Sequence, residues 1–330
     1  MSYPKRHHYV PRKYLERFGR GEQVRVRRRR PAKTHIVNVK NIAAETGLYT
    51  VTTDNGTPST AVEQHLAALE GNGIRVLRQI DQTGQPPAPG SEDRETLALY
   101  LAVQMARTPG KRVMVLFARD VTTYAGDREV DQALITEYEH RRLGRAPKAA
   151  EARAAWTYYH GVRAETGGDP THDDAVIVTL GSVKEYLPFI HARHWRLELS
   201  RKPCFLTSDA PLVLWRPPSP QDAYQGFGLM DAEEIRFPLG PHAQLVLTRG
   251  EGSSVDEVKL GRVAACNQDL ADTCERVVVG HPDRHAWLDR VELCERGPEL
   301  RFNLAPGFRE RSDGSREEMG EVLHFWTTRR

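Results

Sequence analysis

Two adjacent histidines near the start of the chain are the first residues that could do chemistry. His7 and His8 open the segment His7–Pro11, in which Pro11 favours an extended conformation for Val10. Successive side chains of an extended segment point to opposite faces, so only one imidazole can readily face a given site. That imidazole can act as a general base or bind a metal ion. The alternative is a structural histidine that is hydrogen-bonded to the backbone.

Asp209 is a second candidate, because it directly follows the short apolar run Cys204–Thr207. The end of a strand can present a carboxylate on a fixed backbone. The sequence around it, Ser208-Asp209-Ala210-Pro211, also suits a turn in which the aspartate binds the backbone two residues on. Both interpretations stay open.

Arg107 is a third candidate, on the same predicted helix face as Leu97 and Tyr100. Because that face is otherwise apolar, we expect Arg107 to be partly buried near the end of the helix. A buried guanidinium needs a carboxylate or a phosphate. The partner is either a ligand phosphate or a structural carboxylate, with Asp209 and Glu70 as candidates.

Glu63 and Glu70 complete the set of candidates. They are seven residues apart, which places them on one flank of a helix, about 10.5 Å apart along its axis. With Asp209 and one histidine they could bind Mg²⁺ or Mn²⁺, since hard cations prefer oxygen ligands. The alternative, which the pattern favours, is that they pair with arginines at a helix interface.

An α+β fold must position these residues, with a helical N-terminal half packed on a mostly antiparallel sheet from the C-terminal half. We expect three segments in one compact unit: 1–58 with the histidines and a basic β-ribbon, 59–192 helical, and 193–330 rich in strands with late helices. Apolar periodicity predicts five helices between 60 and 166 and another over Val176–His191. Strands are predicted over Gln23–Arg30, Thr34–Val39, Trp195–Leu199, Cys204–Thr207, Leu212–Trp215, Ile235–Phe237 and Gln244–Leu247, and a late helix over Val258–Cys274. No pattern predicts structure from Gly297 onward.

Positive charge is concentrated at the N-terminus. Residues 1–40 carry 13 Lys and Arg against 2 Glu, whereas the whole chain has a net charge of +3. The densest part is Arg25–Arg30. It is either a solvated strand edge that resists aggregation or a ribbon that binds phosphates of a nucleic acid or another anionic ligand.

Several of these segments resemble the domain of unknown function 4238 family. The matching segments are His7–Arg12 with Tyr14, Leu15 and Phe18, then Glu63–Glu70, Gln104–Pro109, Phe205–Pro211, Phe237–Pro241 and Asn267. The resemblance covers roughly residues 5–275, and its specific parts are the first segment and the Ser-Asp-x-Pro motif. Where the family often has asparagine between Asp and Pro, this chain has Ala210. The resemblance implies no established activity.

Three functions fit these residues. The first is a metal-assisted hydrolase of a phosphodiester or nucleic acid, in which His7 or His8, Asp209 and Arg107 act together. The second is a non-enzymatic protein that binds nucleic acid or an acidic partner. The third is an enzyme acting on a small anionic metabolite. The chain lacks the P-loop, dinucleotide-binding, H-E-x-x-H and G-x-S-x-G motifs. It also lacks an apolar run long enough for a membrane span and an N-terminal secretory signal, so we expect a cytoplasmic protein with reduced cysteines.

Overall fold

Helices follow one another through the middle of the chain. The structure is a computed structural model that describes residues 6–223, 225–284, 286–311 and 315–328. The helices are α2 (Ala61–Thr83), α3 (Glu92–Ala106), α4 (Pro109–Ala125), α5 (Gln132–Leu143), α6 (Ala149–Thr166), α7 (His172–Gly181) and α8 (Val183–His191). Side chains of Ser91, Asp131 and Thr171 accept hydrogen bonds at the start of α3, α5 and α7. The single helix predicted over Val176–His191 is divided at Ser182 into α7 and α8.

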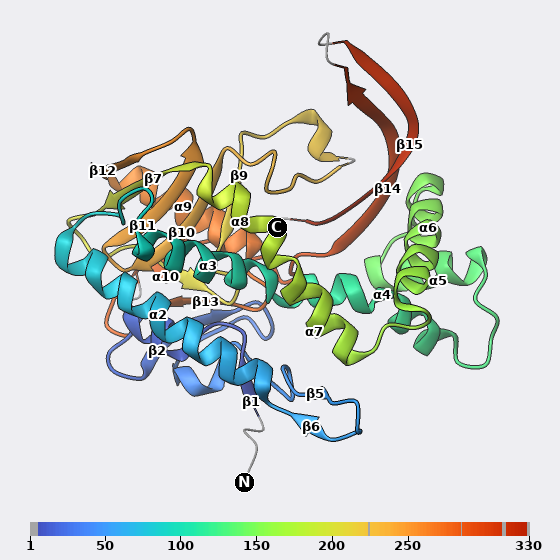
Figure 1. Cartoon of the computed structure of the whole chain (residues 1–330), viewed down its shortest axis with the longest axis horizontal. Coiled ribbons are helices and arrows are strands. Elements are labelled where there is room, and N and C mark those ends of the chain that lie inside the picture. The colour runs from blue at the N-terminus through green and yellow to red at the C-terminus, as the bar shows by residue number, and fades with distance from the viewer. Residues whose placement is uncertain (1–5, 224, 285, 312–314, 329–330) are drawn as a thin grey trace.

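Two sheets lie against these helices, and the predicted α+β class is confirmed (Figure 1). One has the order β12-β7-β11-β10-β9 and the other the order β3-β2-β13-β8. The bounds are β2 (Gln23–Arg28), β3 (Lys33–Asn38), β7 (Arg193–Leu199), β8 (Thr207–Ser208), β9 (Val213–Trp215), β10 (Glu234–Gly240), β11 (Ala243–Arg249), β12 (Ser253–Glu257) and β13 (Val277–Gly280). All pairings are antiparallel except that of β12 with β7. The N-terminal ribbon thus shares a sheet with strands from residues 207 to 280.

Short elements connect the histidine segment to the rest of the fold. Strand β1 (Arg6–His8) pairs with β4 (Ala44–Thr46), with His7 opposite Glu45. The helical turns α1 (Arg12–Leu15) and η1 (Glu16–Phe18) follow, as predicted from Tyr14, Leu15 and Phe18. The remaining elements are η2 (Val39–Asn41), β5 (Val51–Thr52), β6 (Pro58–Ser59), η3 (Pro220–Ala223), α9 (Leu260–Thr273) and α10 (Ala286–Arg290).

A long hairpin that the sequence pattern did not predict ends the chain. Strands β14 (Leu300–Glu310) and β15 (Arg316–Thr327) pair antiparallel and extend away from the rest of the molecule (Figure 1). The base of the hairpin packs on α6 and α4. There Phe302 lies against Tyr158 of α6 and Phe117 of α4. Leu300, Phe302 and Leu304 alternate with polar residues, but Ala305-Pro306-Gly307 interrupts the alternation, so the pattern is too short to predict a strand of this length.

The largest group of buried apolar residues lies between α2, α3 and the five-stranded sheet. Tyr14, Tyr100 and Phe237 contact one another in it, and Trp195 is fully buried. None of the described helices combines the length and apolar composition needed to cross a bilayer, although α2 has 23 residues. Its apolar stripe instead faces α3.

Gly73 allows α2 to approach α3 closely, because a Cβ at this position would overlap the Tyr100 ring. We expect Gly73→Ala to lower the free energy of unfolding by about 2 kcal/mol, since Tyr100 is fully buried and cannot move freely. The matched control is Gly71→Ala, two residues earlier on the exposed side of α2, where a Cβ meets nothing within 4 Å. That change should stabilise the protein by about 0.5–1 kcal/mol, because alanine favours helix. Urea unfolding measures both values, and equal effects would contradict the close approach.

Candidate functional site

The two histidines lie on opposite sides of β1, as the extended segment predicts. His7 is fully buried, and its Nδ1 accepts a hydrogen bond of 2.8 Å from the Tyr49 backbone N–H. The rings of His7 and Tyr49 are stacked, with their centroids 6.0 Å apart. His8 is partly buried, and this burial lowers the pKa of its imidazole to about 4. His8 is therefore neutral at pH 7, and His7 is the histidine that faces the interior.

Arg107 is the centre of a buried polar group beneath the histidines. Its Nη1 donates to Glu70 Oε1 at 2.6 Å. With the Gln104 amide oriented so that its oxygen faces the guanidinium, that oxygen accepts from Nε at 3.1 Å. The hydroxyl of Tyr49 is buried nearby and interacts electrostatically with Arg107. Of the two predicted carboxylate partners, Glu70 is therefore the one found.

The predicted grouping of Glu63, Glu70 and Asp209 around one cation is not formed. Glu63 and Glu70 both lie near Arg107, and burial followed by the charge of Glu70 raises the pKa of Glu63. Asp209 binds a different part of the chain. Within the described residues, no three His, Cys, Asp or Glu side chains come together in a way that could hold a metal ion. Binding of Mg²⁺ or Mn²⁺ stays a prediction that no observed group of ligands supports.

Asp209 holds the turn between α9 and β13. Its Oδ1 accepts from the Glu275 backbone N–H and its Oδ2 from that of Arg276, both at 2.9 Å. Burial raises the pKa of the Asp209 carboxyl to about 6, although these backbone donors oppose the rise. The predicted alternative partner Arg107 is not bound. The strand predicted over Cys204–Thr207 is shorter and later, at Thr207–Ser208, and Asn267 instead holds the backbone of Cys204 and Leu206 through hydrogen bonds.

Glu275 is the functional candidate that the sequence analysis missed. Its Oε1 accepts a 2.9 Å hydrogen bond from the backbone N–H of Gly110, at the start of α4. A Cβ at position 110 would lie 2.6 Å from that oxygen, so glycine makes room for the carboxyl. Burial, and then the charge of Asp209, raises the pKa of Glu275 to about 7. The charge of Asp209 thus acts on the Glu275 carboxyl, whose own backbone N–H donates to Asp209.

Tyr9 connects this carboxyl pair to the histidine segment. Burial raises the pKa of its hydroxyl, and the charge of Asp209 raises it further. Arg276 donates to Glu45, the residue opposite His7 in the β1–β4 pair, at 2.9 Å. The segment that begins with His7 therefore packs against both polar groups. His7 reaches the Arg107 group through Tyr49, and Tyr9 interacts with Asp209.

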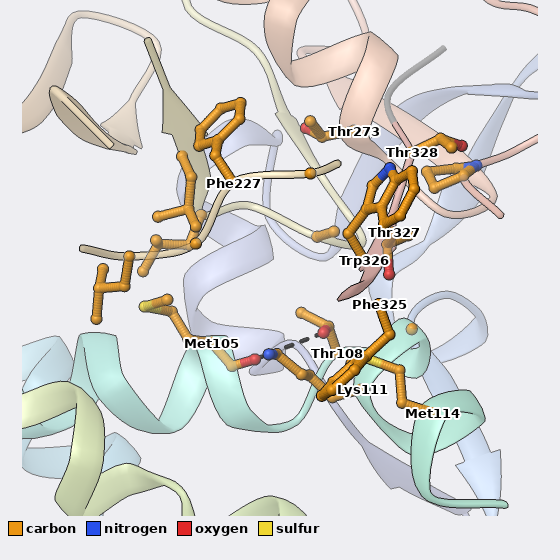
Figure 2. Close-up of a pocket in the computed structure, with 18 of the residues that line it drawn as sticks. Met105, Thr108, Lys111, Met114, Phe227, Thr273, Phe325, Trp326, Thr327 and Thr328 are labelled. Atoms are coloured by element: carbon orange, nitrogen blue, oxygen red, sulfur yellow. Dashed lines mark hydrogen bonds between the residues drawn. The ribbon is translucent and has the colours of Figure 1, made fainter. Parts of the chain in front are cut away.

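A cavity of about 490 Å³ opens beside Glu275. Figure 2 shows it bounded by Met105 and Lys111 on one side and by Phe227 and Trp326 on the other. Its walls are mixed: apolar side chains dominate, and the polar lining residues are Thr108, Lys111, Asp231, Thr273, Glu275, His324, Thr327 and Thr328. In the part of the chain that the structure describes, the buried Nε2 of His324 makes no hydrogen bond. A volume of about 490 Å³ falls within the range of pockets that bind small molecules.

Several arginines of the N-terminal ribbon bind other parts of the same chain, which neither prediction included. Strand β2 lies between β3 and β13, so it is not a solvated sheet edge. Arg25 and Arg27 alternate with the buried Val24 and Val26, and together with Arg29 they donate to backbone carbonyls of residues 271–296. These donors bind the C-terminal part of the fold. Nucleic-acid binding by the ribbon stays a prediction, which now rests on Arg28 and Arg30.

The chain was compared with known protein families, curated proteins and solved structures. A family model described as "Protein of unknown function (DUF4238)" matches residues 6–284. No curated protein and no solved structure matches the chain. The matched range contains both polar groups and ends before the β14–β15 hairpin, which completes the wall of the cavity. The resemblance seen in the sequence motifs is therefore confirmed over most of the chain, which belongs to the DUF4238 family.

Proposed function

We propose that this protein is an enzyme that acts on a small anionic molecule bound in the 490 Å³ cavity, with Glu275 as its general acid–base group. The observation that carries the proposal is the position of Glu275. This carboxyl lies in the cavity wall and accepts a hydrogen bond at the start of α4, while the Glu275 backbone N–H donates to the buried Asp209 carboxyl. A group whose pKa lies near the working pH is the most effective proton donor and acceptor.

The lining of the cavity supports an anionic, partly apolar ligand. Lys111 supplies a positive charge, and its Nζ lies 5.5 Å from the centroid of the Tyr186 ring. It belongs to the first turn of α4, where the helix dipole also favours an anion. Met105, Phe227 and Trp326 supply apolar surface for the rest of the molecule. A ligand that fills the cavity can also bond His324, whose ring nitrogen is otherwise unsatisfied among the described residues.

The direct test follows the fate of small molecules in a metabolite extract. Wild-type protein is expected to consume one or more anionic compounds, as followed by mass spectrometry. Glu275→Gln is expected to consume them at least about 100-fold more slowly, because this variant lacks the carboxyl that transfers the proton. Glu257→Gln is the control, since Glu257 is exposed at the end of β12 and pairs with Arg201. If Glu275→Gln and wild type consume the same compounds at the same rate, the acid–base role is wrong.

The raised pKa of Glu275 also predicts how stability depends on pH. Between pH 4.5 and about 7 the folded protein holds a proton that the unfolded chain has released, so the free energy of unfolding should fall as pH rises through this window. Glu275→Gln removes the cost of ionising this carboxyl. It should therefore be more stable than wild type at pH 8, by on the order of 2 kcal/mol, and nearly equal to it at pH 4.5. Urea unfolding at several pH values measures this, and a variant less stable than wild type at pH 8 would refute the raised pKa.

A further inference from the structure

A second hollow, of about 450 Å³, adjoins the cavity. Glu275 and Pro298 line both, so the two spaces adjoin at these residues. Arginine dominates the walls of the hollow. The six arginines that line it are Arg28, Arg29, Arg30, Arg142, Arg276 and Arg296. Against them stand three glutamates, Glu275, Glu295 and Glu299, which leaves a formal net charge of about three positive units.

These arginines come from separate parts of the chain. Arg28 and Arg30 lie at the end of β2, and Arg142 lies in the last turn of α5. Arg276 directly precedes β13, and Arg296 precedes β14. Positive charges that the fold brings together from such distant segments repel one another. A multiply charged anion bound between them would offset this repulsion, so the hollow is suited to such a ligand.

Contacts with the protein hold some of these arginines in place and leave others available. Arg296 donates to the Leu143 carbonyl at 2.8 Å, and Arg142 binds both oxygens of Glu139. The Arg28 guanidinium, by contrast, has neither a hydrogen bond nor an ion pair with any part of the chain that the structure describes. Arg276 uses only Nη2 for Glu45, and 59% of its side chain is exposed. Arg28 and Arg276 therefore both line the hollow with guanidinium donors that these contacts do not use.

We propose that this hollow binds the phosphate group of a small phosphorylated molecule, whose remaining part passes Glu275 into the 490 Å³ cavity. The inference rests on the function proposed for the cavity and adds the class of substrate. Arginine recognises phosphate through paired, charge-assisted hydrogen bonds, which a planar guanidinium supplies better than an ammonium group. A hollow of about 450 Å³ has room for one or two phosphate groups, and the test below distinguishes these from the backbone of a nucleic acid.

Inorganic pyrophosphate is the probe for the test, with binding measured by calorimetry at about 0.15 M salt, where distant surface charges are screened. We expect saturable binding to wild type. Arg28→Gln should weaken it about tenfold to a hundredfold, because a charge-assisted contact is lost without disturbing any contact within the protein. Arg276→Gln is a second variant with the same expectation. Arg153→Gln is the matched control, since Arg153 lies on α6, outside the hollow. The affinity of this variant for pyrophosphate should differ from that of wild type by less than about twofold.

Three results would overturn the proposal. The first is the absence of saturable binding to wild type up to about 10 mM, a weak limit for a specific site. The second is an equal loss of affinity in Arg28→Gln and Arg153→Gln. The third is tight binding of a single-stranded oligonucleotide that pyrophosphate does not displace, which would assign the arginines to nucleic acid. Glu275→Gln separates this proposal from the acid–base role, because it should bind pyrophosphate at least as tightly as wild type whether or not Glu275 takes part in catalysis.

Discussion

Replacing Arg29 with methionine is expected to lower the free energy of unfolding by about 4 kcal/mol. The side chain is buried, and it donates to five carbonyl oxygens. Three of these carbonyls belong to Ala271, Asp272 and Cys274, at the C-terminal end of α9, where a positive charge is also favoured by the helix dipole. The others belong to Cys294 and Arg296. Methionine fills the volume but leaves several buried acceptors without a donor.

Two further variants separate charge from hydrogen bonding at this position. Arg29→Lys keeps the charge but has only three donors on one nitrogen, so it should recover part of the loss. Arg30→Met is the matched control, because the neighbouring Arg30 is exposed and its ion pair with Glu295 spans 3.5 Å. It should change stability by less than about 0.5 kcal/mol. Urea unfolding gives all three values. A loss below about 1 kcal/mol in Arg29→Met would mean that the carbonyls are satisfied without it.

Replacing Arg107 with methionine is expected to cost about 3 kcal/mol. The guanidinium is fully buried, and its removal leaves Glu70 and the Gln104 amide without a partner. The cost stays at the lower end of the range for buried pairs, because 24% of the Glu70 side chain is exposed and can be hydrated. Arg75→Met, at an exposed position of α2 that pairs with Asp93, should cost little.

A double-mutant cycle with Glu70→Gln tests the pair directly. If Glu70 is the partner that matters, the loss in the double variant will be clearly smaller than the sum of the single losses, with a coupling of about 1–3 kcal/mol. Fully additive losses would show that Arg107 is held by something else. The same variants bear on function, because a purely structural Arg107 lowers stability without changing pyrophosphate affinity at a temperature where the variant is folded.

The hairpin gives the cavity a wall that lies outside the family match. Phe325, Trp326 and Thr327 come from β15, whereas the matched range ends at residue 284. Trp326 packs directly on the backbone of Gly226, where a Cβ would overlap the indole. Asp209 and Glu275 therefore lie within the range that the family model matches, and the opposite wall of the cavity is partly supplied by the segment that follows this range.

Local patterns in the sequence were sufficient for the elements and for one interaction. Apolar periodicity and capping residues such as Ser91 predict where helices run, because both depend on residues only a few positions apart. The same periodicity placed Arg107 on a buried face and Glu70 among its candidate partners, which the ion pair confirms. The alternation of β1 correctly separated His7 from His8. In each case the relevant neighbours lie in the same element or on the facing side of an adjacent helix.

Tertiary structure alone decided the candidate site. Glu275 meets Gly110 across 165 positions of sequence, and its raised pKa comes from burial and from Asp209, neither of which a local pattern contains. The arginines of β2 look like a surface for an external anion, yet Arg29 binds carbonyls that lie more than 240 residues later. Charge is a property of a residue type, but its partner is a property of the fold, because desolvation and hydrogen bonding depend on which distant segments pack around it.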